Sequence, residues 1–268
     1  MIFLAERIGR LIKDLERMMY PQSMEIEHFK MCRTLDRHGD PGGLDTCGWE
    51  DFTASDHWGG HNAYFWFDTS VTIPDAFAGQ SVIFELATGR EKEWDATNPQ
   101  FTIFMDGQPI QGLDTNHRSI VLTEHAVAGT TYRLTLSAFS GTRNFHLLLQ
   151  AQLRVLDRLT EKYYYDLVVP YRVALMLDKQ DPAYIDIIQS LNASLNLLDL
   201  RQEHSPAYYA SLALAQDRLT AGFYGLHCGN ASPVVKCVGH THIDVAWLWT
   251  LAVTEDKAVR SFSTVLAL

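Results

Sequence analysis

The chain has 268 residues, of which 47% are apolar, and its formal net charge is -10. This length is sufficient for two structural units with buried cores. The acidic balance argues against nucleic acid as a partner, because a nucleic-acid surface needs clustered Lys and Arg opposite the phosphates.

The cysteines and the N-terminus predict a cytoplasmic protein with no membrane partner. The four cysteines lack CxxC spacing, which argues against a zinc knuckle or a disulfide framework. Only five uncharged residues precede Glu6, too few for the apolar region of a signal peptide. No segment of the sequence approaches the length of a membrane span.

Residues 1–20 are predicted to form a helix. The apolar residues recur at the spacing that lines one helix face, at Ile8, Leu11, Ile12, Leu15 and Met19. The opposite face mixes both signs of charge without a basic excess. This balance favours a helix packed on its own protein over one that lies on a membrane surface.

Residues 21–157 are predicted to form an antiparallel β-sandwich. Apolar and polar residues alternate over 82–87 and 132–137, and over 145–155 they predict one long strand. Asp106-Gly107 is a hairpin signal, because both residues tolerate a positive φ. Short strands separated by turn residues, with no helices between them, indicate a sandwich of jelly-roll type.

The remainder is predicted to be a helical connector over residues 158–232 and a truncated α/β barrel domain over 233–268. Asp181-Pro182 and Ser205-Pro206 each combine an N-cap residue with proline at the first helical position. VVKCVG is long enough for one buried strand, and a helix is expected from about Thr254. The fold class is therefore α+β, with the sandwich followed by the first strand and helix of an α/β barrel.

A polar cluster follows the predicted barrel strand. If the chain stays extended, His240, His242 and Asp244 point to one side. Imidazole nitrogen and carboxylate oxygen suit Zn²⁺ and similar ions. Spacing alone leaves open whether the histidines bind a metal or form hydrogen bonds within the scaffold.

The segment GHTHIDVAWLW resembles the first catalytic motif of the glycoside hydrolase family 38 α-mannosidases, of the bacterial cytoplasmic type. The KAVRSF run after it, and upstream TGREKEWDATNPQF, the MDGQ hairpin and YYDLVVP, are also similar to the N-terminal portion of these enzymes. Val245-Ala246 stands where the lysosomal and Golgi members have Pro-Gly, a difference that concerns substrate placement.

The resemblance implies roles for four residues. His242 and Asp244 would be two of four ligands of a catalytic zinc, and Trp247 would form an apolar wall against a mannose ring. The family does not use His240 as a ligand, so His240 would support the ligands without binding zinc.

The resemblance also implies a zinc-dependent retaining α-mannosidase that hydrolyses terminal α-mannosides of oligosaccharides. Two carboxyl groups act on the bond in retaining glycosidases, and in this family they would lie downstream of Leu268. The chain alone is therefore expected to be inactive. The residues after about Pro233 are expected to be disordered, to pack on the sandwich or to pair with a second copy in a homodimer.

Two alternatives to an α-mannosidase were considered. A non-catalytic carbohydrate-binding sandwich could present Trp58 or Trp94 to a sugar, although packing of each ring under its own loop or against the barrel is the favoured interpretation. An amidohydrolase-type metalloenzyme also places His-x-His after its first barrel strand. That class explains neither Trp247 nor the upstream sandwich.

Overall fold

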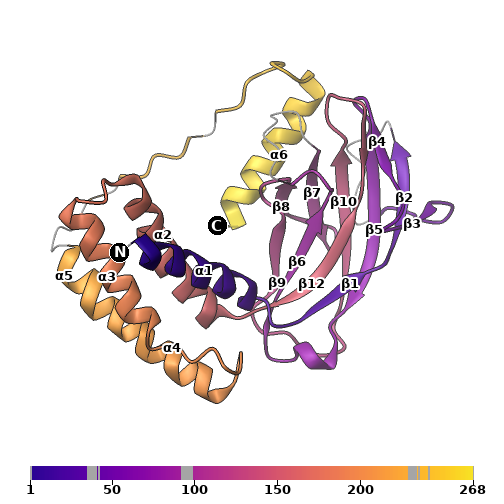
Figure 1. Ribbon diagram of the computed structural model, residues 1–268. Helices are drawn as coiled ribbons and strands as arrows, with labels where there is room; N and C mark the ends of the chain where they lie inside the picture. Colours follow the sequence, from indigo (N-terminus) through magenta and orange to yellow (C-terminus); the bar gives the residue numbers. More distant parts are fainter. Residues whose placement is uncertain are drawn as a thin grey trace. The chain divides into compact units, whose positions relative to one another are not determined.

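The computed structural model describes residues 2–34, 41, 43–91, 99–228, 234, 236–240 and 242–267. The chain divides into two compact units (Figure 1). The first, here called the helical unit, comprises Met1–Pro21 and Leu156–Cys237. The second, called the sandwich unit, comprises Gln22–Val155 and Val238–Leu268.

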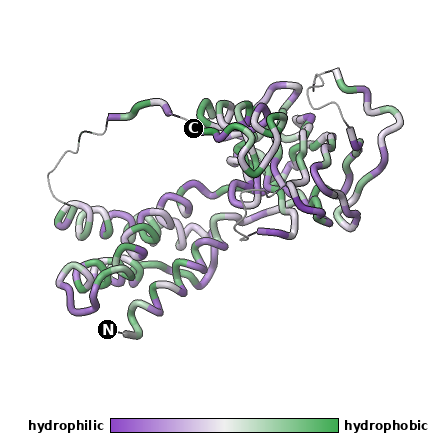
Figure 2. The backbone as a smooth tube through the Cα atoms, turned by 90° about the horizontal axis from the view of Figure 1, so that it is seen from above, coloured by the Kyte–Doolittle hydropathy of each residue, from purple (hydrophilic) through white to green (hydrophobic). Residues whose placement is uncertain are grey.

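The helical unit is built from amphipathic helices, along which polar and apolar segments alternate in Figure 2. Its elements are α1 Ile2–Met18, α2 Arg158–Met176, α3 Pro182–Leu195, α4 Pro206–Leu219, a π-helical turn η2 Thr220–Tyr224, and α5 Gly225–His227. None of the described helices combines the length and the apolar character that crossing a membrane requires.

Helix α1 confirms the predicted N-terminal helix and its buried face. Ile8 and Leu15 are completely shielded from solvent, and Ile12 is nearly so. The hydroxyl of Tyr171 in α2 donates to the backbone oxygen of Ala5 at 3.0 Å. The helix therefore packs within its own unit, against α2 and α3.

The predicted helix starts are also confirmed. The Asp181 carboxylate accepts from the backbone N–H of Ala183 at 2.8 Å, and the Ser205 hydroxyl accepts from that of Tyr208 at 3.2 Å. Each side chain satisfies an N–H that has no partner inside its helix, and such caps contribute about 1 kcal/mol each.

The sandwich unit contains two large antiparallel sheets and a small two-stranded one, which confirms the predicted fold class for this region. The four-stranded sheet has the order β1 Ser23–Ile26, β12 Gln150–Leu156, β6 Ser81–Ala87 and β9 Ser119–Thr123. The six-stranded sheet has the order β3 Glu50–Thr53, β2 His28–Thr34, β5 Tyr64–Thr72, β10 Thr131–Phe139, β7 Gln100–Met105 and β8 Gln108–Asp114. A short 3-10 helix, η1 Asp75–Phe77, follows β5.

Large apolar side chains fill the space between the two sheets. Phe67, Phe84, Phe101, Leu134 and Leu136 are completely buried in one continuous cluster. Burying a side chain of this size contributes about 1.5–3 kcal/mol. The alternation in the sequence arises because every second residue of these strands points into this core.

The predicted hairpin at Asp106-Gly107 joins β7 to β8. Both turn residues have positive φ, at 50° for Asp106 and 82° for Gly107. Aspartate and glycine tolerate this conformation, which matches the twist of the flanking strands.

The single long strand predicted over 145–155 is wrong, because the chain changes sheet within it. β11 Phe145–Leu147 pairs with β4 Trp58–Gly60, whereas β12 joins the four-stranded sheet. Between them, the backbone oxygen of Leu148 accepts from Trp58 Nε1 at 3.0 Å, and its N–H donates to Thr88 at 3.1 Å. A period-two pattern does not distinguish one strand from two consecutive strands when the odd-numbered residues are buried in both.

The strand predicted at VVKCVG is not formed by the described residues of this segment, 234 and 236–240. A strand depends on hydrogen bonds to neighbouring strands, and the pairings of the described strands all lie within the sandwich. His240, His242 and Asp244 therefore lie outside the described strands and do not share a strand face, contrary to the sequence prediction. The predicted helix is present as α6 Leu251–Ala267, which packs on β8 and β7 (Figure 1).

Candidate functional site

The motif segment, residues 238–249, leads into α6 and borders a cavity of about 460 Å³ in the sandwich unit. His240, His242 and Asp244 all line this cavity, and Trp249 lines it as well. Trp247 is not among the lining residues. The structure thus brings together three of the four residues that the sequence singled out.

His242 and Asp244 form the closest polar contact in the motif. Nε2 of His242 lies 3.0 Å from Oδ1 of Asp244. Both side chains are accessible, with exposed fractions of 75% and 47%. The two donor atoms therefore converge on one point that solvent can reach.

The spacing of this pair fits a shared zinc ion. Two donors bound to one tetrahedral zinc at about 2.0–2.1 Å lie roughly 3.3 Å apart, close to the observed 3.0 Å. Among the described residues, no group of three or more His, Cys, Asp or Glu side chains is placed to hold a metal. The chain thus supplies a fitting pair of donors but not a complete set of ligands.

The aromatic side chains of the motif contact one another in two pairs. The His240 ring centroid is 6.5 Å from that of His242. Trp247 is 59% exposed and makes an edge-to-face contact with Trp249, with ring centroids 5.5 Å apart. Trp249 is in turn fixed by a 3.2 Å hydrogen bond from Nε1 to the hydroxyl of Thr254. Trp249 therefore supports the ring of Trp247, and much of that ring stays accessible to solvent.

The sandwich contributes the opposite wall of the cavity. Gln100 at the start of β7, Asp114 at the end of β8 and His117 all line it. The sequence analysis assigned none of these a role, because they lie more than a hundred residues before the motif and carry no metal-ligand spacing. Only the packing of α6 on the sheet brings them to the motif.

Two cations of α6 also face this cavity. Lys257 and Arg260 both donate to Oε1 of Gln100, Lys257 at 3.3 Å, and the Lys257 ammonium lies 4.1 Å from the ring centroid of Trp249. Burial and, to a smaller extent, the charge of Arg260 lower the pKa of Lys257 to about 8. Burial also lowers the pKa of Arg260 to about 10.

Of the two tryptophans considered as sugar platforms, Trp58 is buried. It is 4% exposed and packs against Phe65, Phe67 and Phe101 with centroid distances of 5.3–5.4 Å. Trp58 is therefore a core residue and not a sugar platform, and it packs between the sheets instead of under its own loop. Trp94 lies outside the described residues.

Comparison with known proteins places two parts of the chain. Residues 40–145 match the family model "Alpha-mannosidase, jelly roll domain", and residues 232–268 match "Glycosyl hydrolases family 38 N-terminal domain". The second match contains the whole motif segment. The first covers most of the sandwich.

Curated relatives agree with these matches. The chain is 29% identical to mouse alpha-mannosidase 2C1 over 222 residues, which are 76% of this chain and 20% of that protein, and 28% identical to the human protein over the same shares. It is 23% identical to Dictyostelium discoideum alpha-mannosidase G over 75% of this chain and 19% of the relative. The chain thus spans about a fifth of the length of these relatives.

Solved structures resemble the chain more distantly. A Ruminococcus gnavus β-glucuronidase matches 51% of this chain and 29% of its own length, with a TM-score of 0.38 and 9% identity. The family models and the curated relatives, by contrast, agree with each other. Over the residues it contains, the chain is therefore similar to the N-terminal portion of the family 38 α-mannosidases.

Proposed function

We propose that this chain provides the first part of a zinc-dependent retaining α-mannosidase, which hydrolyses terminal α-mannosides of oligosaccharides. One observation carries the proposal: the converging donors of His242 and Asp244, 3.0 Å apart, lie in the segment that matches the family 38 model. The four thiols are free, three of them exposed, which supports a reducing compartment such as the cytoplasm. The homodimer expected from the sequence stays a prediction.

Each motif residue has a role in this proposal that its geometry supports. His242 Nε2 and one Asp244 oxygen would hold the metal, and both would have to be free of the proton that their hydrogen bond shares. Zinc, when bound, supplies positive charge and a template for two adjacent sugar hydroxyls. The exposed face of Trp247 packs against the apolar face of a mannose ring.

His240 has a supporting role in the proposed site. Its ring stands beside that of His242 without a hydrogen bond between the two among the described contacts. A neighbouring imidazole in this position restricts the orientation of His242 and so keeps Nε2 directed toward the proposed metal position. This is the role that residues behind metal ligands commonly have.

A chimera tests the proposal. The chain would replace the matching part of mouse alpha-mannosidase 2C1, and hydrolysis of p-nitrophenyl α-mannoside and bound zinc would be measured. We expect zinc-dependent hydrolysis in the chimera. Asp244→Ala should lower both hydrolysis and zinc content by about 100-fold or more, since even the residues behind metal ligands contribute 10–100-fold.

The matched control is Asp217→Ala, which removes an exposed carboxylate from α4 in the other unit. This variant should keep full activity and zinc. If D244A retained both activity and zinc, the assignment of Asp244 as a ligand would be wrong. Activity that persists after chelation would exclude zinc dependence.

A further inference from the structure

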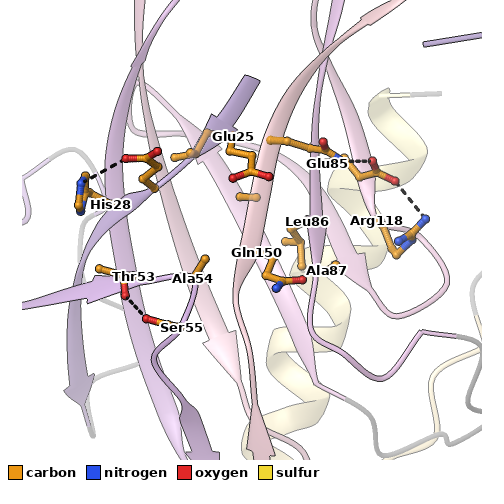
Figure 3. Close-up of a pocket in the computed structure, with 14 residues that line it drawn as sticks. Glu25, His28, Thr53, Ala54, Ser55, Glu85, Leu86, Ala87, Arg118 and Gln150 are labelled. Atoms are coloured by element: carbon orange, nitrogen blue, oxygen red, sulfur yellow. Dashed lines mark hydrogen bonds and ion pairs between the residues drawn. The ribbon is translucent and has the colours of Figure 1, made fainter. Parts of the chain in front are cut away.

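The sandwich has a second cavity, of about 510 Å³, which shares no lining residue with the cavity at the motif (Figure 3). It is bounded by the ends of β1 and β12, by β6, and by the turn after β3. Its lining residues are Glu25, Ile26, Glu27, His28, Thr53, Ala54, Ser55, Glu85, Leu86, Ala87, Arg118, Gln150, Ala151 and Gln152. Its volume lies within the range of small-molecule sites.

Glu85 is a fixed hydrogen-bond acceptor in the wall of this cavity. The residue is 9% exposed, and its Oε2 accepts from Gln152 at 2.9 Å and from Arg154 at 2.8 Å. Its Oε1 accepts from Arg118 at 3.0 Å. Two guanidinium groups therefore neutralise this carboxylate and hold it in place, while Oε1 keeps a second lone pair.

Glu25 and Gln150 supply unused polar groups beside this network. Both side chains are exposed, and neither makes a side-chain hydrogen bond among the described residues. In Figure 3 they lie between Thr53 and Ser55 on one side and Glu85 on the other. The Thr53 hydroxyl donates to Asp56 at 2.8 Å and lies 3.0 Å from the Ser55 hydroxyl, so these two oxygens can accept from a ligand.

The composition of the wall identifies the chemistry of a ligand. Carboxylates and hydroxyls accept, Arg118 donates, and amides do both, while Ala87 adds a small apolar surface. Sugar hydroxyls also both donate and accept, and a sugar ring has an apolar face. An anionic ligand would meet Glu25 and Glu27, whereas the positive charge of Arg118 is already paired with Glu85.

We propose that this cavity is a binding site for a neutral saccharide, whose hydroxyl groups bond to Glu25, Glu85 and Gln150. The site is separate from the proposed mannose site and does not depend on zinc. A chain with this second site would bind a glycan at the sandwich as well as at the motif.

Calorimetric titration of the full chain tests the proposal. All measurements use the His242→Ala/Asp244→Ala background, which removes any contribution from the motif. The probes are methyl α-mannoside, α-1,2-mannobiose, cellobiose and N,N′-diacetylchitobiose. We expect saturable binding of at least one probe, with an affinity that does not change with salt concentration, because the ligand is uncharged.

Variants locate the site. Glu25→Ala and Gln150→Ala should each lower the affinity about 3- to 10-fold, the loss expected for one hydrogen bond. Both residues are exposed, so the melting temperature should stay unchanged. Glu50→Ala and Gln22→Ala remove exposed residues of the same types outside the cavity and should leave the affinity unchanged.

Three outcomes would overturn the proposal. The first is no saturable binding of any of the four saccharides. The second is saccharide binding that E25A and Q150A leave unchanged. The third is salt-sensitive binding of spermidine without saccharide binding, which would assign the cavity to a polyamine. None of these results bears on activity in the 2C1 chimera, so the two proposals fail independently.

Discussion

Packing of α6 on the sheet partly buries the charged side chain of Lys257. Its ammonium is partly removed from water between Gln100, Trp249 and Arg260. The negative charge of Asp114 acts in the opposite direction, but burial and Arg260 dominate. Docking of α6 on the sheet therefore opposes protonation of Lys257.

This opposition predicts a pH dependence of α6 docking. The pKa is about 8 in the docked state against an ordinary value of 10.5, so the undocked state binds more protons between these values. Docking should therefore strengthen as the pH rises from about 8 towards 10.5. Hydrogen-exchange protection factors of the α6 amides, corrected for intrinsic rates, should increase over this range. The increase should be smaller in Lys257→Met, and an identical increase in both proteins would contradict the prediction.

Gly112 also affects the docking of α6, because the absence of a side chain leaves room for Arg260. A Cβ at this position would lie 2.9 Å from Cβ of Arg260 and 3.2 Å from its Cγ, and the Gly112 N–H donates to the Thr264 hydroxyl at 3.1 Å. Gly112→Ala should therefore weaken docking by about 1–3 kcal/mol. Faster exchange of the α6 amides would show this. Gly239→Ala, where a Cβ meets nothing within 4 Å, is the control and should have no effect.

Individual residues differ in how far the sequence could predict them. His242 and Asp244 were predictable, because two donors close in sequence stay close in most local conformations. Gln100, Asp114 and His117 were not predictable as walls of the same cavity. Their position depends on the docking of α6 on β8, and a single sequence carries no signal for that contact.

At the level of elements, Ser194 links three helices of the helical unit. Its hydroxyl donates to the backbone oxygen of Ala215 in α4 at 2.6 Å and lies 2.7 Å from the Tyr163 hydroxyl in α2. Ser194 is completely buried. One small polar group in α3 thus fixes the positions of both neighbouring helices.

Removing this hydroxyl should destabilise the helical unit by about 1–3 kcal/mol, because it leaves buried polar groups without a partner. Ser194→Ala would be compared with Tyr163→Phe, which removes only one of the two contacts and should cost about 1 kcal/mol. Urea unfolding monitored by helical circular dichroism measures both. Ser190→Ala, at a half-buried position of the same helix, should change little. A larger loss for Y163F than for S194A would contradict this account.

The type of most elements was predictable, but their partners were less so. Caps and periodicity located α1, α3 and α4, and Asp106-Gly107 located the β7–β8 hairpin, because these signals act within a few residues. The break between β11 and β12 depends instead on Trp58, which is distant in sequence. The absence of a strand in described residues 236–240 likewise reflects pairing, which no local pattern determines.

For the whole molecule, the two units differ in their relation to the proposed chemistry. The helical unit lines neither of the two cavities discussed here, whereas both lie within the sandwich unit. Within that unit, α6 is held against the strands through Gln100 and Gly112. The strands therefore support the segment that carries His242 and Asp244, the two proposed ligands.

The last prediction concerns these 268 residues taken alone. Tight zinc binding requires a preformed set of ligands, commonly four donors held by neighbouring residues. Here only His242 and Asp244 converge, and no described cluster adds a third His, Cys, Asp or Glu. The chain should therefore bind zinc weakly and should not hydrolyse p-nitrophenyl α-mannoside, even with added zinc.

Calorimetric zinc titration and the hydrolysis assay test this on one sample. The weak binding that remains should decrease in His242→Ala/Asp244→Ala, because these side chains provide the converging donors. A tight site with one zinc per chain would mean that donors from another part of the molecule, or from a second copy, complete the set. Turnover would mean that these residues contain both carboxyl groups that a retaining glycosidase needs.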